Sequence, residues 1–142
     1  MDVSEVRRLV RDVIERARHT GGERRARNDA ANRVWIDVRD QIVVPACRQV
    51  AQVLRSEGYP FQVSTPGETV RLSSEKSAED VIELALDTTG AVPALVCRVQ
   101  HTRGREIRQD ERVVAPGVPM AALTDEQVVA LLVEVLPPFV ER

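Results

Sequence analysis

The stretch that decides the fold is residues 46–63, which read ACRQVAQVLRSEGYPFQV. Up to Leu54 the apolar residues recur every three or four positions, which is the spacing of one face of an α-helix. From Phe61 onward they recur every second position, which is typical of a β-strand. Gly58 separates the two patterns and can take the left-handed conformation that commonly ends a helix. The sequence therefore predicts a helical N-terminal part followed by a sheet.

The helix predicted nearest the N-terminus covers residues 3–18, and the pair Gly21-Gly22 is expected to end it. Its apolar residues lie on one face at helical spacing and comprise Val3, Val6, Leu9, Val10, Val13, Ile14 and Ala17. The members that also fit coiled-coil spacing are Val3, Val6, Val10, Val13 and Ala17. About two heptads are marginal for a helix alone, so this face is expected to pack on the domain, on a second copy or on another protein.

A second helix is predicted over about residues 29–57, ending before Gly58. Pro45 lies in its middle, where a proline removes one backbone hydrogen bond, so a kink or break is expected near residues 41–44. Trp35, the sole tryptophan, is placed on the inner face of this helix. A buried Trp35 is expected, and an exposed Trp35 at a partner surface is the alternative.

After Gly58 the sequence predicts an antiparallel meander of four or five strands. The predicted strands are Phe61–Val63 and Val70–Leu72 around a Pro66-Gly67 turn, then residues 81–86, 94–101 and 106–114. Arg103-Gly104-Arg105 is predicted to form the turn between the last two strands. Successive hairpins need no parallel crossover, so the fold class is α+β. Residues 103–112 alternate in charge sign, which is typical of cross-strand charge pairs on an exposed ribbon.

One more helix is expected near the C-terminus, with Thr124 as its N-cap and Gln127 completing a capping box. It is apolar on nearly every side, which predicts burial on more than one face. The whole chain is predicted to form a single α+β domain over residues 1–142. Its parts are a helical region (1–57), a sheet (58–118) and a C-terminal helix (119–142).

The composition of the chain limits its class. Its 142 residues are 43% hydrophobic and 30% charged, which fits one globular domain and does not fit a disordered chain. No window approaches the roughly 18 to 20 apolar residues of a membrane span, so no membrane partner is expected. The N-terminus is charged from Asp2 onward and has no apolar signal region, which predicts a cytoplasmic location.

The basic residues are unusual in kind and in distribution. Nineteen of the twenty are arginine, a bias typical of the GC-rich genomes of many bacteria. Lys76, the only lysine, lies in a polar stretch that lacks the motif of a phosphate-binding or Schiff-base lysine. Residues 1–57 carry 12 arginines against 9 acids, and residues 58–142 carry 8 basic residues against 13 acids. The net charge of -2 argues against a dedicated polyanion-binding protein.

The motifs of several catalytic and cofactor-binding classes are missing from the sequence. It has no glycine-rich phosphate loop, no Gly-x-Ser-x-Gly and no Cys/His cluster, so no catalytic residue, cofactor or metal site is predicted. Cys47 and Cys97 are expected to be buried and reduced. Cys97 and His101 are four residues apart on one predicted strand, roughly 13 Å, which is too far for a nucleophile–base pair.

Three functional hypotheses follow, and the leading one is a non-enzymatic protein–protein interaction or adaptor module that self-associates as a homodimer. Its basis is that the amphipathic helices offer more apolar surface than a small sheet can cover. The candidate partner-binding residues are Val3, Val6, Val10, Val13 and Trp35. The least favoured hypothesis is a small enzyme or ligand carrier with a pocket near Cys97 and His101.

The second hypothesis is a nucleic-acid-associated accessory protein that uses the basic stretch Arg16–Arg33. Its candidate anion-binding residues are Arg16, Arg18, Arg24, Arg25 and Arg27, which surround the glycine pair in an expected interhelical loop. Glu23 and Asp29 interrupt this stretch, and no aromatic residue lies among the arginines to stack on a base. Both observations weigh against nucleic acid as the partner.

Overall fold

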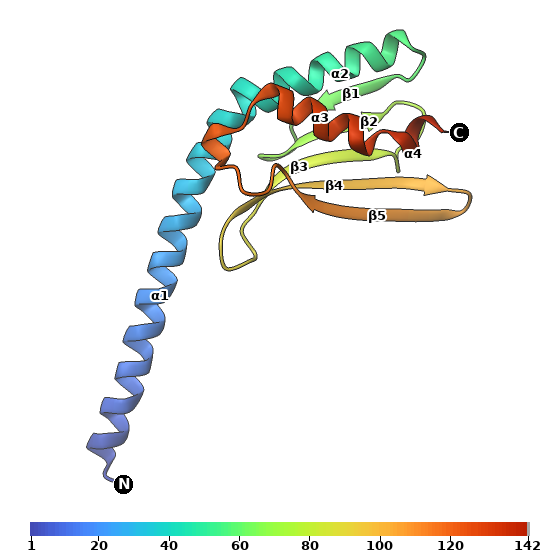
Figure 1. Cartoon of the computed structure of the whole chain (residues 1–142). Coiled ribbons are helices and arrows are strands. Elements are labelled where there is room, and N and C mark those ends of the chain that lie inside the picture. The colour runs from blue at the N-terminus through green and yellow to red at the C-terminus, as the bar shows by residue number, and fades with distance from the viewer. Residues whose placement is uncertain (142) are drawn as a thin grey trace.

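The fold combines a long helical segment with a five-stranded antiparallel sheet, which confirms the α+β class. The computed structural model describes residues 1–141 (Figure 1). The helical segments are α1 (Val3–Val38), η1 (Arg39–Val43), α2 (Val44–Ser56), η2 (Met120–Ala122), α3 (Asp125–Val135) and α4 (Pro137–Val140). The strands are β1 (Phe61–Ser64), β2 (Val70–Ser74), β3 (Val81–Asp87), β4 (Ala94–Arg103) and β5 (Glu106–Val113). They lie side by side in this order, and each neighbouring pair is antiparallel.

Helix α1 continues through the position where the sequence predicts its end. Gly21 and Gly22 both lie inside it, so the prediction that they end the first helix is wrong. Each glycine costs a helix interior about 1 kcal/mol relative to alanine, and the arginine, glutamate and alanine residues on both sides are good helix formers that offset this cost. The expected interhelical loop therefore does not exist, and the basic residues around Gly21 are helical.

The division between the two N-terminal helices lies instead at η1, where Pro45 predicts a kink. Proline has no N–H to donate to the carbonyl of Gln41, and its ring clashes with that carbonyl. The backbone forms a π-helical turn, in which the Val44 N–H donates to the carbonyl of Arg39, five residues earlier. At this turn the chain changes direction, so that α1 extends away from the sheet while α2 runs along it (Figure 1). The predicted kink is confirmed.

Helices α2 and α3 cover one face of the sheet and enclose the hydrophobic core (Figure 1). Its largest fully buried side chains are Trp35, Leu72, Ile82, Leu84, Leu132, Val43, Val70, Val128, Cys47 and Cys97. In β4, Leu95, Cys97 and Val99 of the predicted inner face are buried in this core, and Val96 on the opposite face is buried as well. On β2, β3 and β4 the side chains of this core therefore face the helices, and the other face of the sheet carries half-buried charges.

The predicted turn glycines lie at the ends of hairpins. Gly67 has a φ of 60°, and Gly104, between β4 and β5, has a φ of 64°. Positive φ is strained for residues with a side chain, so glycine suits both positions. Arg103 pairs with Glu106 across the second turn, and this pairing sets the register of β5 against β4.

Helix α3 begins at the predicted capping box. The Gln127 N–H donates to Thr124 Oγ1 at 3.2 Å, and the Thr124 N–H donates to Gln127 Oε1 at 3.0 Å. The buried side chains of α3 are Val128, Leu131, Leu132 and Val135. They share one face, while Val133 on the other side is exposed. The burial on several faces that the sequence predicts is therefore not observed in the single chain.

Candidate interaction surface on the first helix

The N-terminal half of α1 projects away from the rest of the molecule (Figure 1). Every residue from Met1 to Thr20 is exposed, and partial burial begins at Gly21. Asp2 is the N-cap of the helix, and its carboxylate accepts the Ser4 N–H at 3.3 Å. This half of the helix is therefore held by its backbone hydrogen bonds and its cap, without support from the core.

An apolar stripe runs along the projecting half. We call it the α1 stripe, and it consists of Val3, Val6, Leu9, Val10, Val13, Ile14 and Ala17. Val3 is 71% exposed, Val13 is 59% exposed, and even Ile14 is 42% exposed. From Val3 to Ala17 the stripe is about 21 Å long at 1.5 Å per residue. Continuous apolar surface of this kind on a helix is typical of a contact surface for another protein.

The α1 stripe has the heptad pattern of a helix that packs on another helix. The a positions are Val3, Val10 and Ala17, the d positions are Val6 and Val13, and Leu9 (g) and Ile14 (e) widen the stripe on either side. The next a and d positions are held by Thr20, Arg24 and Arg27. The apolar surface therefore stops where the helix begins to contact the body of the molecule.

The five candidate anion-binding arginines are distributed around α1. At about 100° per residue, the helix puts Arg16, Arg24 and Arg27 on one side and Arg18 and Arg25 on the opposite side. Arg24 Nη2 donates to the carbonyl oxygens of Thr88 and Thr89, both at 3.3 Å, so this guanidinium fixes the β3–β4 connection to α1. The structure does not gather these arginines into the phosphate clamp that an interhelical loop would form.

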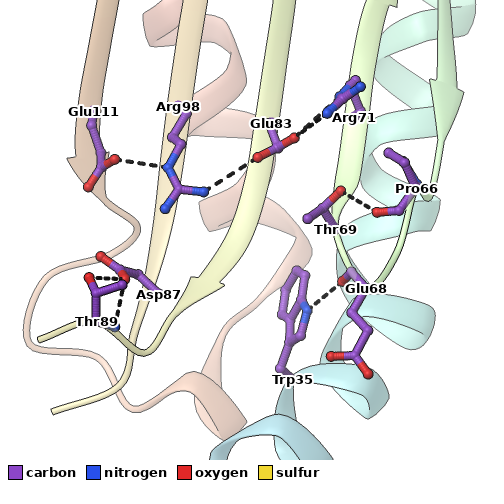
Figure 2. Close-up of polar contacts among 10 residues, drawn as sticks. All are labelled: Trp35, Pro66, Glu68, Thr69, Arg71, Glu83, Asp87, Thr89, Arg98 and Glu111. Atoms are coloured by element: carbon purple, nitrogen blue, oxygen red, sulfur yellow. Dashed lines mark hydrogen bonds and ion pairs between the residues drawn. The ribbon is translucent and has the colours of Figure 1, made fainter.

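The C-terminal half of α1 is fixed to the body through Trp35. Its indole is 1% exposed, and Nε1–H donates to the backbone carbonyl of Glu68 at 2.7 Å (Figure 2). Asn32 Nδ2 donates to Oε1 of the same Glu68 at 3.4 Å. The alternative in which Trp35 is exposed at a partner surface is therefore wrong, and Trp35 does not belong to the candidate surface.

Cys97 and His101 do not share a pocket. Cys97 is fully buried, and burial raises the pKa of its thiol to about 11. Burial, followed by the nearby Cys97, raises the pKa of Cys47 to about 12. His101 points to the ring of Phe139, with 5.9 Å between ring centroids, and borders an open hollow of about 450 Å³. Both cysteines are free thiols, and protonated thiols in apolar surroundings are poor nucleophiles.

The face of the sheet that the helices leave open carries a ladder of charges across β2 to β5 (Figure 2). Arg71 Nη2 lies 2.7 Å from Glu83 Oε2, and Arg98 lies 3.5 Å from Glu83 and 2.9 Å from Glu111. These residues border an open hollow of about 510 Å³. Asp110 also borders the hollow and pairs with Arg112. Because each of these five charges has a partner of opposite sign, the hollow does not concentrate unpaired charge of either sign.

The charges of β5 pair differently from the prediction. Glu111 does form a cross-strand pair, with Arg98 of β4. The other ion pairs formed within β5 are Arg108–Glu106 at 3.4 Å and Arg112–Asp110 at 2.9 Å. They run along the strand, because residues two positions apart share one face of a strand. The sequence predicts the exposed ribbon correctly and the partners only in part.

Comparison of the chain with protein-family models, with curated proteins and with solved structures finds no match. Within residues 1–141, no helix combines the length and the apolar character that crossing a membrane requires. The same part of the chain contains no group of three or more His, Cys, Asp or Glu side chains able to hold a metal ion. The strongest indication of function is therefore the geometry of the α1 stripe.

Proposed function

We propose that this chain is a non-enzymatic interaction module that self-associates through the α1 stripe, with a homodimer as the smallest assembly. The observation that carries this proposal is the exposure of the whole stripe on a helix that projects from the body (Figure 1). Packing the stripe against a second copy removes its apolar side chains from water, and the chain's own sheet and helices do not. Free, buried thiols also fit the reducing cytoplasm that the sequence predicts.

The polar side of the projecting half-helix favours a second copy over a polyanion. Residues 1–20 carry five arginines and four acids, interspersed along the helix. An anionic membrane or a nucleic acid is attracted by the arginines and repelled by the acids, and no aromatic residue in this stretch offers a ring to lipid or base. A second copy brings both signs of charge. Nucleic-acid binding by the basic stretch therefore has less support.

The residues that flank the stripe favour a parallel arrangement of the two helices. In a parallel pair, Leu9 at g lies beside Ile14 at e of the second copy, which extends the apolar contact. An antiparallel pair that overlaps the whole stripe sets Leu9 against Arg16 and Ile14 against Arg7. That arrangement removes the two arginine side chains from water and gives them no group of opposite charge to pair with, so it is disfavoured.

Disruption of the stripe tests the proposal. Sedimentation equilibrium at tens of micromolar is expected to show dimers or larger assemblies for the wild-type chain. In the V6D/V13D variant two carboxylates enter the apolar contact, and we expect association roughly a hundredfold weaker or more. The matched control R11Q/R18Q changes the net charge equally on the far side of the helix and should associate like the wild type. A monomeric wild-type chain, or unchanged association of V6D/V13D, contradicts the proposal.

A cysteine at the start of the stripe tests the parallel orientation. In a parallel pair the two residues at position 3 face each other, so a V3C chain should form an intermolecular disulfide under mild oxidation. An antiparallel pair separates them by about the length of the stripe, some 21 Å or more. S4C, on the outer side of the helix, is the control that should stay unlinked. The buried Cys47 and Cys97 keep the background low. If the V3C and S4C chains cross-linked equally, the parallel arrangement of the two helices would be ruled out.

A further inference from the structure

Strand β5 forms an open edge of the sheet (Figure 1). Residues 106–111 are all exposed, and within residues 1–141 the only strand beside β5 in the sheet is β4. The opposite edge differs, because β1 has four residues and its Phe61 carbonyl accepts Arg55 Nη2 at 3.4 Å. An open edge presents backbone N–H and C=O groups to any strand that can align with them. The long, exposed edge of β5 is therefore the one that can take a further strand.

One hydrogen bond shows which backbone groups face this edge. The Val114 N–H donates to the Leu95 carbonyl at 2.9 Å, immediately beyond the last pair of the β4–β5 register. In an antiparallel ladder, residues bonded to the neighbouring strand alternate with residues that are not. Counting back from Val114, the N–H and C=O groups of Ile107, Gln109 and Glu111 point away from β4. These are the groups available to another strand.

The intervening residues carry charges in a regular order. They are Glu106, Arg108, Asp110 and Arg112, which read negative, positive, negative, positive along the strand. The register places them opposite Arg103, His101, Val99 and Cys97 of β4, so all four side chains share the helix side of the sheet. The order is antisymmetric about Gln109, since each residue on one side has a partner of opposite charge at the same distance on the other.

We propose that β5 pairs antiparallel with β5 of a second copy, about a two-fold axis at Gln109, so that the two sheets become continuous. In this register Glu106 of each copy faces Arg112 of the other, and Arg108 faces Asp110. Opposite charges placed directly across an antiparallel pair stabilise it. The contact uses a surface separate from the α1 stripe and so goes beyond the function proposed above.

The backbone groups fit the same register. The two Gln109 residues lie opposite each other and exchange N–H···O=C bonds, and Ile107 exchanges them with Glu111 of the second copy. The side chain of Gln109 is already held, since its Nε2 donates to Gln100 Oε1 at 3.0 Å. It lies on the face of the sheet opposite to the four charges, so it does not obstruct their pairing.

The charge order selects this register over its neighbours. The smallest shift that keeps the outward backbone groups aligned is one that moves the axis by one residue. Moving it to Arg108 sets that residue against itself and Glu106 against Asp110. Moving it to Asp110 sets Asp110 against itself and Arg108 against Arg112. Like charges directly opposite destabilise a strand pair, so both neighbouring registers are disfavoured relative to the axis at Gln109. An axis two residues away, at Ile107 or Glu111, again sets opposite charges against each other, but it forms two such contacts instead of four.

Two charge reversals test the proposal in chains that also carry V6D/V13D, which removes the α1 contact. In this background, association at hundreds of micromolar is expected to remain and is measured by sedimentation. R108D places two aspartates opposite each other across the axis, and D110R places two arginines opposite each other. Each is expected to weaken self-association by about tenfold or more. An equimolar mixture of the two variants restores both ion pairs and should associate like the background.

The outcomes separate this contact from the α1 contact. Three results together support β5 pairing. The V6D/V13D chain associates, the association is lost when R108D or D110R is added, and it returns when the two reversal variants are mixed. A background that stays monomeric at these concentrations, or reversals that leave its association unchanged, overturns it. Neither result bears on the α1 stripe, because the α1 contact is tested by comparing V6D/V13D with the wild type at tens of micromolar.

Discussion

The two halves of α1 both carry apolar side chains at helical spacing, and their surroundings are opposite. Residues 3–20 present an apolar face that is exposed along its whole length. Further along the same helix, Trp35 and Val38 are buried, and Arg24 and Asn32 bond to residues of the sheet region. Helical periodicity therefore shows which face of a helix is apolar. It does not show whether the same chain covers that face.

The difference between the halves has a geometric cause. The π-helical turn at η1 directs α2 along the sheet and α1 away from it (Figure 1). At 1.5 Å per residue the 36 residues of α1 span about 54 Å, which exceeds the reach of a small five-stranded sheet. Only the half nearest the turn finds a surface to pack on. The half beyond it is exposed along its whole length.

Removal of the tryptophan anchor should have the largest effect on stability. W35A leaves a cavity and an unpaired Glu68 carbonyl, and we expect the free energy of unfolding to fall by about 3–5 kcal/mol. The comparison is V10A in the exposed half, which should change the stability of the monomer by less than about 0.5 kcal/mol. Urea denaturation followed by circular dichroism, at concentrations below assembly, measures both.

A milder variant covers the case in which W35A does not fold. W35F keeps most of the packing and removes the bond to the Glu68 carbonyl, so a loss of about 1–3 kcal/mol is expected. If W35A and V10A proved equally mild, the contrast between the two halves would be refuted.

The smallest effect concerns the glycine pair that joins the halves. A Cβ at Gly21 would approach Arg25 Nη1 no closer than 3.5 Å, and one at Gly22 no closer than 4.0 Å, so alanine fits both positions. G21A and G22A should each stabilise the helix by about 0.5–1 kcal/mol and raise its ellipticity. G58A is the matched control and should destabilise, because Gly58 has a φ of 94°. Lower ellipticity in G21A would contradict a continuous helix through Gly21 in solution.

The two proposed contacts have a joint consequence for assembly. Each is isologous, meaning that the same surface of both copies meets across a two-fold axis. One chain with two such contacts forms a closed dimer if both axes coincide and a closed dihedral assembly, such as a D2 tetramer, if the axes intersect at a suitable angle. With any other placement of the axes it forms an extended array. Sedimentation of the wild type against V6D/V13D and R108D distinguishes these assemblies by their size.

The local elements were largely predictable from the sequence. Thr124 and Gln127 form the expected capping box, Gly104 takes the expected turn, and the strands lie within a few residues of their predicted bounds. Pro45 marks the kink because the loss of an N–H acts on its own turn of helix. Gly21 and Gly22 do not end the helix, because a glycine pair weakens a helix only modestly and the flanking residues decide the outcome.

The candidate surfaces were predictable to different degrees. The stripe of Val3, Val6, Val10 and Val13 is visible as a heptad pattern. The sequence places Trp35 in the same set, and only the tertiary contact with Glu68 removes it. The complementarity of β5 depends on which backbone groups point outward, and the bond from Val114 to Leu95 determines that.

The sequence by itself determined the fold class, the turn positions and the existence of an apolar face on the first helix, because these depend on the spacing of residues close in the chain. Tertiary structure decided that this face is left uncovered and that β5 is an open edge. Both outcomes depend on which segments that are distant in the sequence lie close together in space. The periodicity of apolar residues does not contain this information.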